Sequence, residues 1–379
     1  MKTKNNILLL FIVALMLMIN SCKDGIETLD NAIYFANSSA ASISTVVTIK
    51  ADEPREVKIP IRLSNSVDYD VSYTLEVDTN ALKDYNKRFM SEYEVYPASL
   101  YSIEDGSKLI KAGDLLSSVD LTLLPPDSTV DDGLKYAIPL VVKSENMSGL
   151  VESNVHVIVV NRYFTINLPY LMIGRNIVGN FPDNPMENMS AFTIEYNVYT
   201  YDAERQNVML FATANASNSL IYSRIQDAGA ENKRKFMFKL SGFGAGSLTV
   251  DEKIQDRTWY HMALTYDGSI YRMYFNGQEM KTLTSPGHIH TNTQITFGST
   301  STRYALNGFI SEFRVWSAAR TQLQIANNMY SVNPDSENLE LYWKCSEGEG
   351  TEIKDYSGNE RNGELPLATI WMPFTFPPE

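Results

Sequence analysis

Cysteine and histidine are scarce in this 379-residue sequence, which contains 2 Cys and 4 His. They leave little material for a zinc or iron site built from these two ligand types. Calcium stays compatible with the composition because it takes oxygen ligands. Basic residues are also in the minority, with 32 Lys and Arg against 45 Asp and Glu and a formal net charge of −13. This balance argues against a nucleic-acid partner, whose phosphates require a basic surface.

Tryptophan is rare as well, with 4 residues, whereas the chain has 22 Tyr and 16 Phe. Tyrosine and phenylalanine favour β-strands, so the composition predicts an all-β protein. At about 150 residues per domain, the length predicts two domains, each large enough to bury its own core.

The N-terminus predicts an exported protein. Lys2 and Lys4 precede an apolar run over residues 7–19 that leads into Ile19-Asn-Ser-Cys22. The run is shorter than the roughly 20 residues that span a bilayer and suits the hydrophobic region of a signal peptide. The residues up to Cys22 resemble a bacterial lipobox. This resemblance implies a signal peptide over residues 1–21 and an anchor in outer-membrane lipid through a lipidated Cys22, followed by a linker over residues 22–31. An ordinary signal peptide with an incidental cysteine is the alternative.

The residues around Cys22 carry two further expectations. Lys23-Asp24-Gly25 resembles the short charged signal of Bacteroidetes lipoproteins, which implies a position on the outer membrane facing the cell exterior. If Cys22 is consumed in a thioether, Cys345 is the only thiol left, so no internal disulfide can form.

Residues 32–162 are expected to form an immunoglobulin-like β-sandwich. Residues 57–63 and 71–77 alternate apolar and polar side chains, which places one set in a core and the other in water. Only residues 82–93 read as a helix. His156 lies among apolar neighbours and is expected to be a structural strand histidine.

The order of sequence segments in this half resembles the DUF1735 family, which is found at the N-terminus of Bacteroidetes surface lipoproteins. The matching pieces are residues 71–75, 96–99, 110–113, 135–140 and 157–161. They contain no catalytic motif, and the resemblance implies a spacer or platform domain.

Residues 163–379 carry clearer strand and turn signals. Residues 192–199 alternate over eight positions and predict a half-buried strand. Asp267-Gly268 and Asn276-Gly277 suit type I′ hairpin turns, so residues 259–285 are expected to form a three-stranded meander. Thr321 and Gln324 match a capping box that starts a short helix.

The blocks of this half resemble, in order, the laminin-G/pentraxin-like branch of the concanavalin A-like jelly rolls. The matching segments are residues 192–196, 259–268, 274–277, 309–316 and 355–359. The resemblance implies two antiparallel sheets, with ligands on a concave face or its rim loops. Together with the lipobox and the DUF1735-like half, it implies an accessory lipoprotein of a Bacteroidetes glycan-utilisation system beside a TonB-dependent importer. Fold alone does not fix function.

We expect no catalytic residues. No predicted strand carries two carboxylates at the spacing of a glycosidase, and no Gly-x-Ser-x-Gly elbow or phosphate loop is present. Glu312 is expected to be alone on its strand, facing away from Phe309 and Phe313. His288 and His290 are interpreted as a solvated loop pair, with metal or sugar binding as the alternative. A glycosidase with an unrecognised carboxylate pair stays an alternative function.

A saccharide presents flat apolar C–H faces bordered by hydroxyl groups, so its binding site needs exposed aromatic rings beside planar polar groups. Trp259, Trp316 and Trp343 are expected in the core. Trp371 lies in a Pro-rich tail, either as a lid on the sandwich or as an exposed platform. The candidate ligand-binding residues are Trp371, Tyr304, Arg303, Tyr222, Arg224, Tyr201 and Asp202. Apart from Trp371, each also fits an ordinary surface position.

The expected partner is an oligosaccharide, and host N-glycan is one candidate. Asp355, Asn359 and Asp202 are candidate calcium ligands, although Asp355 equally fits an Asx turn that binds its own backbone. No other cofactor is assigned. A protein-binding adhesion module is the alternative within the binding class.

Overall fold

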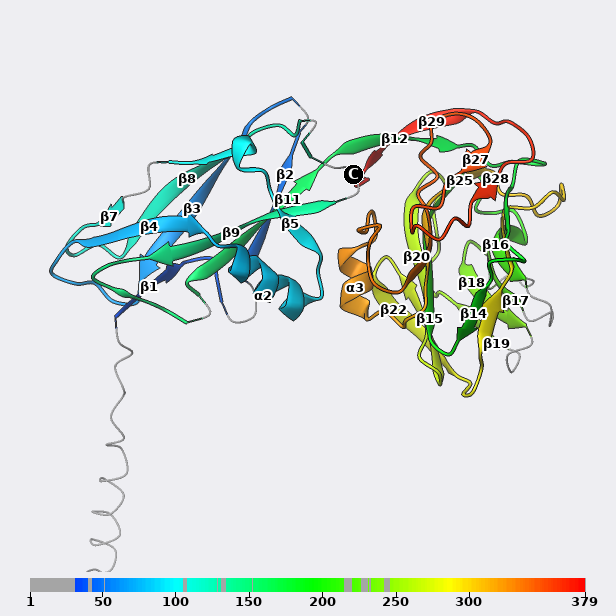
Figure 1. Ribbon diagram of the computed structural model, residues 1–379, viewed down its shortest axis with the longest axis horizontal. Coiled ribbons are helices and arrows are strands. Elements are labelled where there is room, and N and C mark those ends of the chain that lie inside the picture. Colours follow the sequence, from blue (N-terminus) through cyan, green and yellow to red (C-terminus); the bar gives the residue numbers. More distant parts are fainter. Residues whose placement is uncertain are drawn as a thin grey trace, which may run out of the picture.

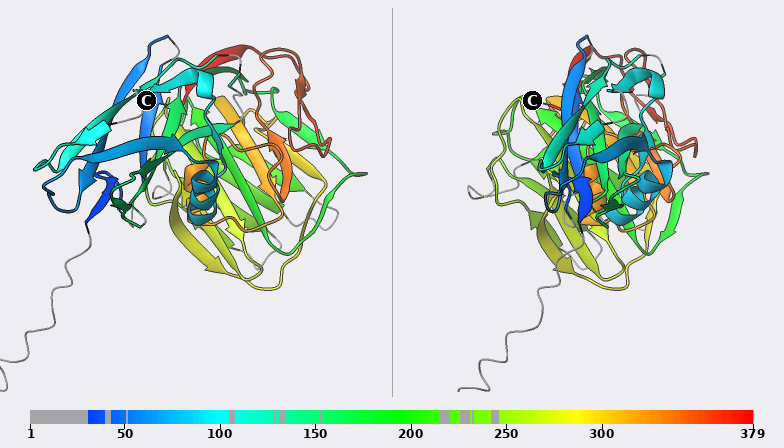
Figure 2. Two further views of the ribbon diagram at one scale, coloured as in Figure 1. Left: turned by 60° about the vertical axis from the view of Figure 1, so that its left-hand side comes forward. Right: turned by 90° about the vertical axis from the view of Figure 1, so that its left-hand side faces the viewer.

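A computed structural model describes residues 31–39, 43–50, 52–104, 108–127, 129–130, 134–151, 153–214, 220–225, 231, 233–241 and 246–378. The expected signal peptide and Cys22 lie outside the described residues. Within them, no helix combines the length and apolar character needed to cross a bilayer. Two β-rich lobes follow one another along the chain (Figures 1 and 2).

The N-terminal lobe is a sandwich of two sheets, which with the second lobe confirms the all-β prediction. One sheet has the order β10 (Ser148–Gly149), β1 (Ala32–Phe35), β3 (Arg55–Leu63), β8 (Leu116–Leu123) and β6 (Tyr101–Ile103). The other has the order β2 (Ser44–Ile49), β11 (Val155–Arg162), β9 (Lys135–Lys143), β4 (Val71–Val77) and β7 (Lys108–Ile110), with β5 (Tyr93–Val95) beside β9. A 3₁₀ turn, η1 (Ala98–Leu100), precedes β6.

Period-two patterning builds this lobe as expected. In β3, Ile59, Ile61 and Leu63 are buried while Lys58 and Arg62 are exposed. The His156 prediction is also confirmed. Its Nδ1 and Nε2 lie 2.7 Å and 2.9 Å from the hydroxyl groups of Ser38 and Thr45, and burial lowers its pKa to about 4.

Helix α2 spans Thr79–Phe89, so the predicted range of 82–93 was wrong at both ends. It begins earlier because the Asp78 carboxylate accepts a hydrogen bond from the backbone N–H of Asn80 and caps the first turn. It ends earlier because Met90 adopts the left-handed conformation, with φ of 48°. Tyr93 instead enters strand β5.

The C-terminal lobe is a jelly-roll sandwich of an eight-stranded and a six-stranded sheet. The eight-stranded sheet has the order β19 (Gly246–Thr249), β18 (Phe236–Ser241), β17 (Leu220–Ile225), β16 (Val208–Ala214), β24 (Gln294–Phe297), β13 (Ile177–Asn180), β28 (Gly363–Glu364) and β27 (Glu352–Ile353). The six-stranded sheet has the order β22 (Gln278–Thr284), β21 (Ile270–Phe275), β20 (Trp259–Tyr266), β15 (Phe192–Thr200), β25 (Gly308–Trp316) and β26 (Leu339–Trp343).

The described part of the lobe also contains a ribbon of β12 (Phe164–Pro169) with β29 (Trp371–Phe376), a pair of β14 (Met186–Met189) with β23 (His290–Asn292), and helix α3 (Gln322–Asn327). Helix α3 begins with the predicted capping box of Thr321 and Gln324. Trp316 and Trp343 are buried as expected, whereas Trp259 is half-buried against Phe374 and Phe376 of the ribbon.

The predicted meander forms as β20, β21 and β22. The Asn276-Gly277 turn is confirmed, because Phe275 pairs directly with Gln278 and both turn residues have positive φ. The first turn lies one residue later than predicted, around Gly268 and Ser269. It shifts because the Asp267 carboxylate accepts hydrogen bonds from the backbone N–H groups of Ser269 and Ile270.

Strand β15 is buried on both faces, so the half-buried prediction was wrong. Ile194 and Tyr196 face the core between the sheets, but Thr193, Glu195 and Asn197 on the other face are also at most 1% exposed. The β12–β29 ribbon and the segment after β25, which includes α3, cover this outer face of the six-stranded sheet.

A bulge in β25 corrects the prediction about Glu312. The register against β15 shifts around Glu312, whose φ is 54°, so Phe309 lies on the outer face and Phe313 on the core face. Phe313 packs on Phe297, with ring centroids 4.5 Å apart. Phe309 and Phe313 therefore do not form one set, and Glu312 shares the outer face with Phe309.

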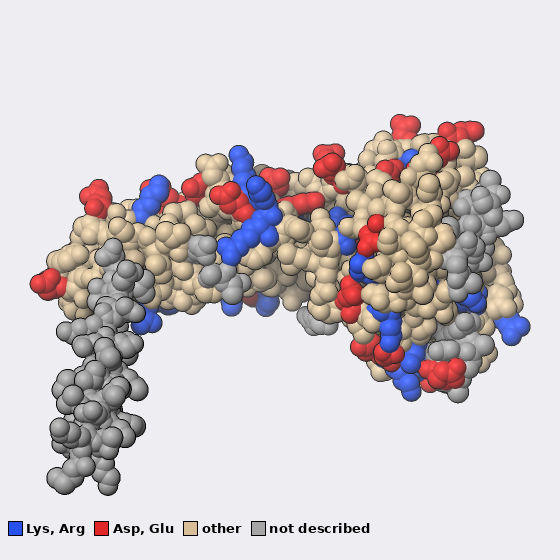
Figure 3. Space-filling view, turned by 90° about the horizontal axis from the view of Figure 1, so that it is seen from below, with Lys and Arg blue, Asp and Glu red and all other residues tan. Residues whose placement is uncertain are grey.

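The two lobes meet where α2 approaches α3, below the β12–β29 ribbon (Figure 1). Asn327 Nδ2 donates to the carbonyl of Phe89 at 3.3 Å, and Ser336 Oγ donates to Glu92 Oε2 at 2.9 Å. Lys135 of β9 crosses the junction and donates to the Asn327 carbonyl and to Asn328 Oδ1. On the face drawn in Figure 3, basic and acidic side chains are interspersed over the described parts of both lobes.

Candidate functional site

Tyr222 and Arg224 lie on the outer face of the eight-stranded sheet, since Ile221 and Ser223 between and beside them are buried in the core. The Arg224 guanidinium carbon lies 4.4 Å from the centroid of the Tyr222 ring, and its Nη1 donates to Asn207 Oδ1 at 3.2 Å. The guanidinium therefore already covers one face of this ring.

Arg303 and Tyr304 lie in the loop between β24 and β25 and repeat this arrangement, with the guanidinium 5.6 Å from the ring centroid. The backbone N–H of Met209 donates to the Tyr304 carbonyl at 2.8 Å, and Met209 pairs with Arg224 in the sheet. The structure thus brings these four predicted residues to one region, which we call the eight-stranded face (Tyr222, Arg224, Arg303 and Tyr304).

The other three predicted residues lie elsewhere. Tyr201 packs edge-on against Tyr170 and Tyr199, and Asp202 pairs with Arg205 at 3.6 Å. Trp371 begins β29, pairs with Pro169 and is half-buried against the core, which is the lid arrangement. The structure does not bring these three residues to the eight-stranded face.

The candidate calcium ligands are engaged in turns and ion pairs. Asp355 Oδ1 accepts from the backbone of Tyr342 and Ser357, and its Oδ2 accepts from the backbone of Arg361 at 3.0 Å. This geometry fits the Asx-turn alternative. Among the described residues, no group of three His, Cys, Asp or Glu side chains is arranged to hold a metal ion.

The interpretation of His288 and His290 as a solvated pair was wrong for His290. His290 belongs to β23, is 1% exposed and has its Nε2 2.9 Å from the Tyr271 hydroxyl. Burial lowers its pKa to about 3. His288 is half-buried, with its Nε2 2.8 Å from Ser285 Oγ.

A polar cleft lies on the outer side of β26 in the C-terminal lobe. Its volume is about 350 Å³, and we call it the tyrosine cleft. Tyr330 and Tyr356 are half-buried in its wall, and Tyr342 is fully buried beneath. The other lining residues are Phe164, Thr165, Ile166, Asn167, Glu312, Ser331, Lys344, Ser346, Glu347 and Gly348. None of the seven residues predicted to bind ligand is among them.

A backbone hydrogen bond and neighbouring ammonium groups position the rings of the cleft. The Tyr356 backbone N–H donates to the Tyr342 carbonyl at 2.8 Å, and the two rings meet edge-on with centroids 6.2 Å apart. Lys344 Nζ lies 4.6 Å from the Tyr356 centroid and 5.5 Å from the Tyr342 centroid. Lys354 Nζ also lies 5.2 Å from the Tyr356 centroid, so ammonium groups contact both rings at this wall of the cleft.

Two carboxyl groups line the same cleft. Burial raises the pKa of Glu312, an effect that Arg314 and the Tyr342 hydroxyl oppose; Glu312 Oε2 accepts from that hydroxyl at 2.7 Å and from Arg314 at 3.3 Å. Burial also raises the pKa of Glu347, whose Oε1 accepts from the Lys354 backbone at 3.0 Å. Raised pKa values keep both groups closer to neutral than free glutamates.

A buried ion network supports the wall that carries Tyr330. Glu195 Oε1 lies 3.3 Å from Arg314 Nε and accepts from Trp316 Nε1 at 2.7 Å. Burial by itself raises the pKa of Glu195. Arg314, His261 and Arg320 lower the pKa by more than burial raises it, so that it is about 2. Arg314 in turn donates to the carbonyls of Asn328 and Met329, directly before Tyr330.

Sequence reasoning missed Tyr330, Tyr342, Tyr356 and Lys344 as candidate ligand contacts. Tyr342 belongs to β26, Lys344 follows that strand, and Tyr356 lies in the turn at Asp355, but nothing local shows that these segments face one hollow. The one available signal was Tyr356 beside the Asx-turn residue Asp355, which places a ring at a rigid turn.

Comparison with known proteins agrees with this architecture. Residues 174–326 match the model of the concanavalin A-like lectin/glucanases superfamily, and residues 29–149 match the model of an N-terminal domain. The C-terminal lobe is therefore a concanavalin A-like domain of laminin-G type, preceded by a separate N-terminal domain.

Two particular proteins are similar to the chain. A proposed carbohydrate-binding protein from Bacteroides ovatus matches 92% of this chain over 98% of its own, with 24% sequence identity and a TM-score of 0.55, which shows a shared fold. Pappalysin-1 from Mus musculus is 32% identical over 77 residues, which are 19% of this chain. That match spans only 5% of pappalysin-1.

Proposed function

We propose that this protein binds glycans without cleaving them, on the bacterial cell surface, and holds an oligosaccharide for a TonB-dependent importer. The observation that carries the glycan-binding step is the tyrosine cleft on a concanavalin A-like domain. The fold shared with the Bacteroides ovatus protein supports the same class of ligand.

The cleft has the chemistry that a saccharide requires. The rings of Tyr330 and Tyr356 offer apolar surfaces to sugar C–H faces, and Ser331, Ser346 and Asn167 offer hydrogen-bonding groups to the hydroxyls. Its volume of about 350 Å³ lies within the range of small-molecule sites.

The lipid anchor and the cell-surface position rest on the sequence around Cys22. An anchored binder would raise the concentration of captured glycan beside an importer. We expect mass spectrometry of the mature protein from its native host to find acyl chains on Cys22, and a Cys22→Ala variant to leave the membrane fraction. A soluble wild-type protein would contradict the anchor but leave glycan binding intact.

Glycan binding is tested on an array of plant and host oligosaccharides, including N-glycans, with the purified mature chain. We expect binding to at least one class, with the signal lost in a Tyr330→Ala, Tyr356→Ala double variant. A Tyr69→Ala variant, at an exposed tyrosine of the N-terminal lobe, is the matched control. Silence of the wild type across the array would overturn the proposal and favour the protein-binding adhesion module.

A glycoside hydrolase is a second candidate function, because Glu312 and Glu347 line one cleft and have raised pKa values, as a general acid requires. Glu312 already accepts hydrogen bonds from Tyr342 and Arg314, which favours a structural role for it. Release of shorter products from a bound glycan, abolished by Glu347→Gln, would establish the hydrolase. Unchanged glycan after prolonged incubation supports non-catalytic binding.

A further inference from the structure

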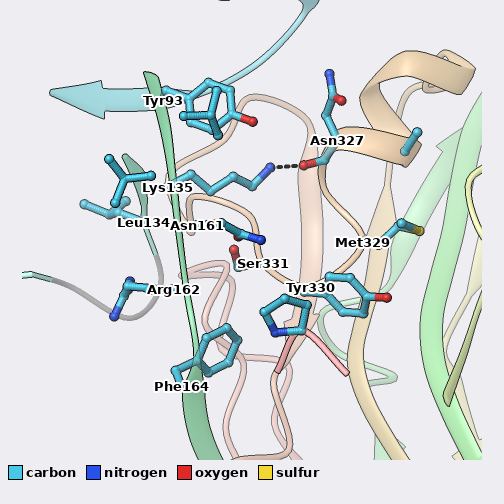
Figure 4. A pocket seen from close by; sticks show the side chains of 14 residues that line it. Tyr93, Leu134, Lys135, Asn161, Arg162, Phe164, Asn327, Met329, Tyr330 and Ser331 are labelled. Atoms are coloured by element: carbon cyan, nitrogen blue, oxygen red, sulfur yellow. Dashed lines mark hydrogen bonds between the residues drawn. The ribbon is translucent and has the colours of Figure 1, made fainter. Parts of the chain in front are cut away.

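A second cavity lies between the two lobes, with a volume of about 140 Å³ (Figure 4). We call it the interdomain pocket. The N-terminal lobe contributes Tyr93, Leu134, Lys135, Val159, Val160, Asn161 and Arg162, and the C-terminal lobe contributes Phe164, Ala326, Asn327, Met329, Tyr330, Ser331 and Pro377. At the roughly 30 Å³ that each water molecule takes up in the liquid, this space corresponds to about five waters.

The interdomain pocket adjoins the tyrosine cleft. Phe164, Tyr330 and Ser331 line both hollows, so these residues form the boundary between them. Phe164 belongs to β12, the first strand after the N-terminal lobe, and Tyr330 follows α3. A chain molecule that lies in the tyrosine cleft and passes Tyr330 therefore enters the space between the lobes.

The lining of the pocket repeats the combination seen in the cleft. Tyr93 and Tyr330 supply rings from opposite lobes, and the Asn161 amide points toward the centre of the pocket (Figure 4). Ser331 adds a hydroxyl group. Aromatic faces with an amide and a hydroxyl group suit a sugar ring better than a purely apolar ligand.

The lobes are fixed relative to each other at this pocket. Lys135, half-buried, donates to the carbonyl of Asn327 and to Asn328 Oδ1 across the junction, as the dashed line in Figure 4 marks for Asn327. Arg314 donates a hydrogen bond to the backbone carbonyl of the same Asn328. A ligand that contacts both walls therefore meets a preformed site and does not first have to order the two lobes.

We propose that the interdomain pocket is a second saccharide subsite, so that a glycan longer than the tyrosine cleft is held by both domains. This inference rests on the proposed glycan-binding function and extends it to the N-terminal domain, which then forms part of the binding site rather than a spacer. The ligand class is an oligosaccharide whose terminal or penultimate sugar reaches past Tyr330.

The test measures affinity against oligosaccharide length. The probes are array glycans of one to six sugar units, and the variants are Asn161→Phe, which fills the pocket, and Asn161→Ala, which only removes the amide. Asn146→Ala, at an exposed position of the N-terminal lobe, is the matched control. Denaturant unfolding of each variant checks that the fold is kept.

For the longer members of a bound series, we expect Asn161→Phe to weaken binding at least tenfold and Asn161→Ala severalfold, while the shortest bound members keep wild-type affinity. Equal affinity of wild type and both variants at every length would overturn the second subsite and leave the tyrosine cleft standing. An equal loss at every length would also overturn it. Failure of the wild type to bind any glycan would instead refute the proposed function, and this inference with it.

Discussion

The two sheets of the C-terminal sandwich differ in what lies on their outer faces. On the eight-stranded sheet, Tyr222 and Arg224 of β17 are half-buried and stack on each other. On the six-stranded sheet, Glu195 and Asn197 of β15 are buried almost completely. Strand β15 alternates apolar and polar residues, yet this pattern does not show whether its polar face is covered or meets water.

The difference arises from segments distant in sequence. Asn197 Nδ2 donates to the Met329 carbonyl at 2.9 Å, and Arg314 donates to the Asn328 carbonyl at 2.9 Å. The polar side chains of the six-stranded face thus satisfy the backbone of the segment that covers them. A polar residue in an alternating strand marks an outer face, but long-range contacts decide whether that face meets water or another layer.

The largest expected effect on stability comes from removing a buried charge on the covered outer face of the six-stranded sheet. Glu195→Ala removes one of the two carboxylates that pair with Arg314, the other being Glu312, and leaves the buried guanidinium only partly compensated. We expect the free energy of unfolding to fall by about 3–5 kcal/mol, measured by urea denaturation at pH 7. Glu204→Ala, at an exposed ion pair with Arg234, is the control and is expected to change stability by less than about 1 kcal/mol. Equal, small effects of both variants would show that the two kinds of position do not differ.

Low pH tests the covered face in a second way, because the pKa of Glu195 is lowered to about 2 from an ordinary 4.5. A lowered folded-state pKa gives stability that is fully present above about pH 4.5 and is lost as the pH falls toward 2. At 1.36 kcal/mol per pKa unit, this loss is of order 3 kcal/mol. We expect wild type to lose that much more stability than Glu195→Gln between pH 5 and 2. Parallel pH profiles of the two proteins would contradict the network.

The glycan affinities of two variants compare the tyrosine cleft with the eight-stranded face directly. We expect Tyr356→Ala to weaken glycan affinity at least tenfold, which is about 1.4 kcal/mol, because it removes an apolar ring from a concave site. Tyr222→Ala is expected to change affinity less than twofold, since Tyr222 does not line the tyrosine cleft. Isothermal titration with the strongest glycan from the array measures both. The reverse ranking would move the binding site to the residues predicted from sequence.

Much of the fold could be predicted from local signals. The Asn276-Gly277 turn and the capping box at Thr321 form as expected, because each depends on residues within a few positions of one another. The bulge at Glu312 could not be predicted, since it appears only in the register between β25 and β15. One extra residue there moves Phe309 to the opposite face from Phe313.

The candidate site was less accessible to sequence reasoning than the fold. Its residues come from β12, the segment after α3, β26 and the turn at Asp355, which are up to about 190 positions apart in the chain. Tyr330 follows a short helix and carries no local signature of a binding residue. Aromatic residues beside charged ones, such as Tyr222 with Arg224, attracted attention because they are adjacent in sequence, whereas the cleft is assembled across the fold.

The smallest expected effect is the loss of the stacked guanidinium on the eight-stranded face. Arg224→Ala removes a contact with the half-buried Tyr222 ring and a hydrogen bond to Asn207. At this degree of exposure we expect unfolding stability to fall by about 1 kcal/mol or less, measured by urea denaturation beside Glu195→Ala. Because an arginine on an uncovered face exchanges its contacts for water, whereas one on a covered face cannot, a loss above about 3 kcal/mol would mean that a further layer also covers the eight-stranded sheet. The contrast between the two sheets would then no longer hold.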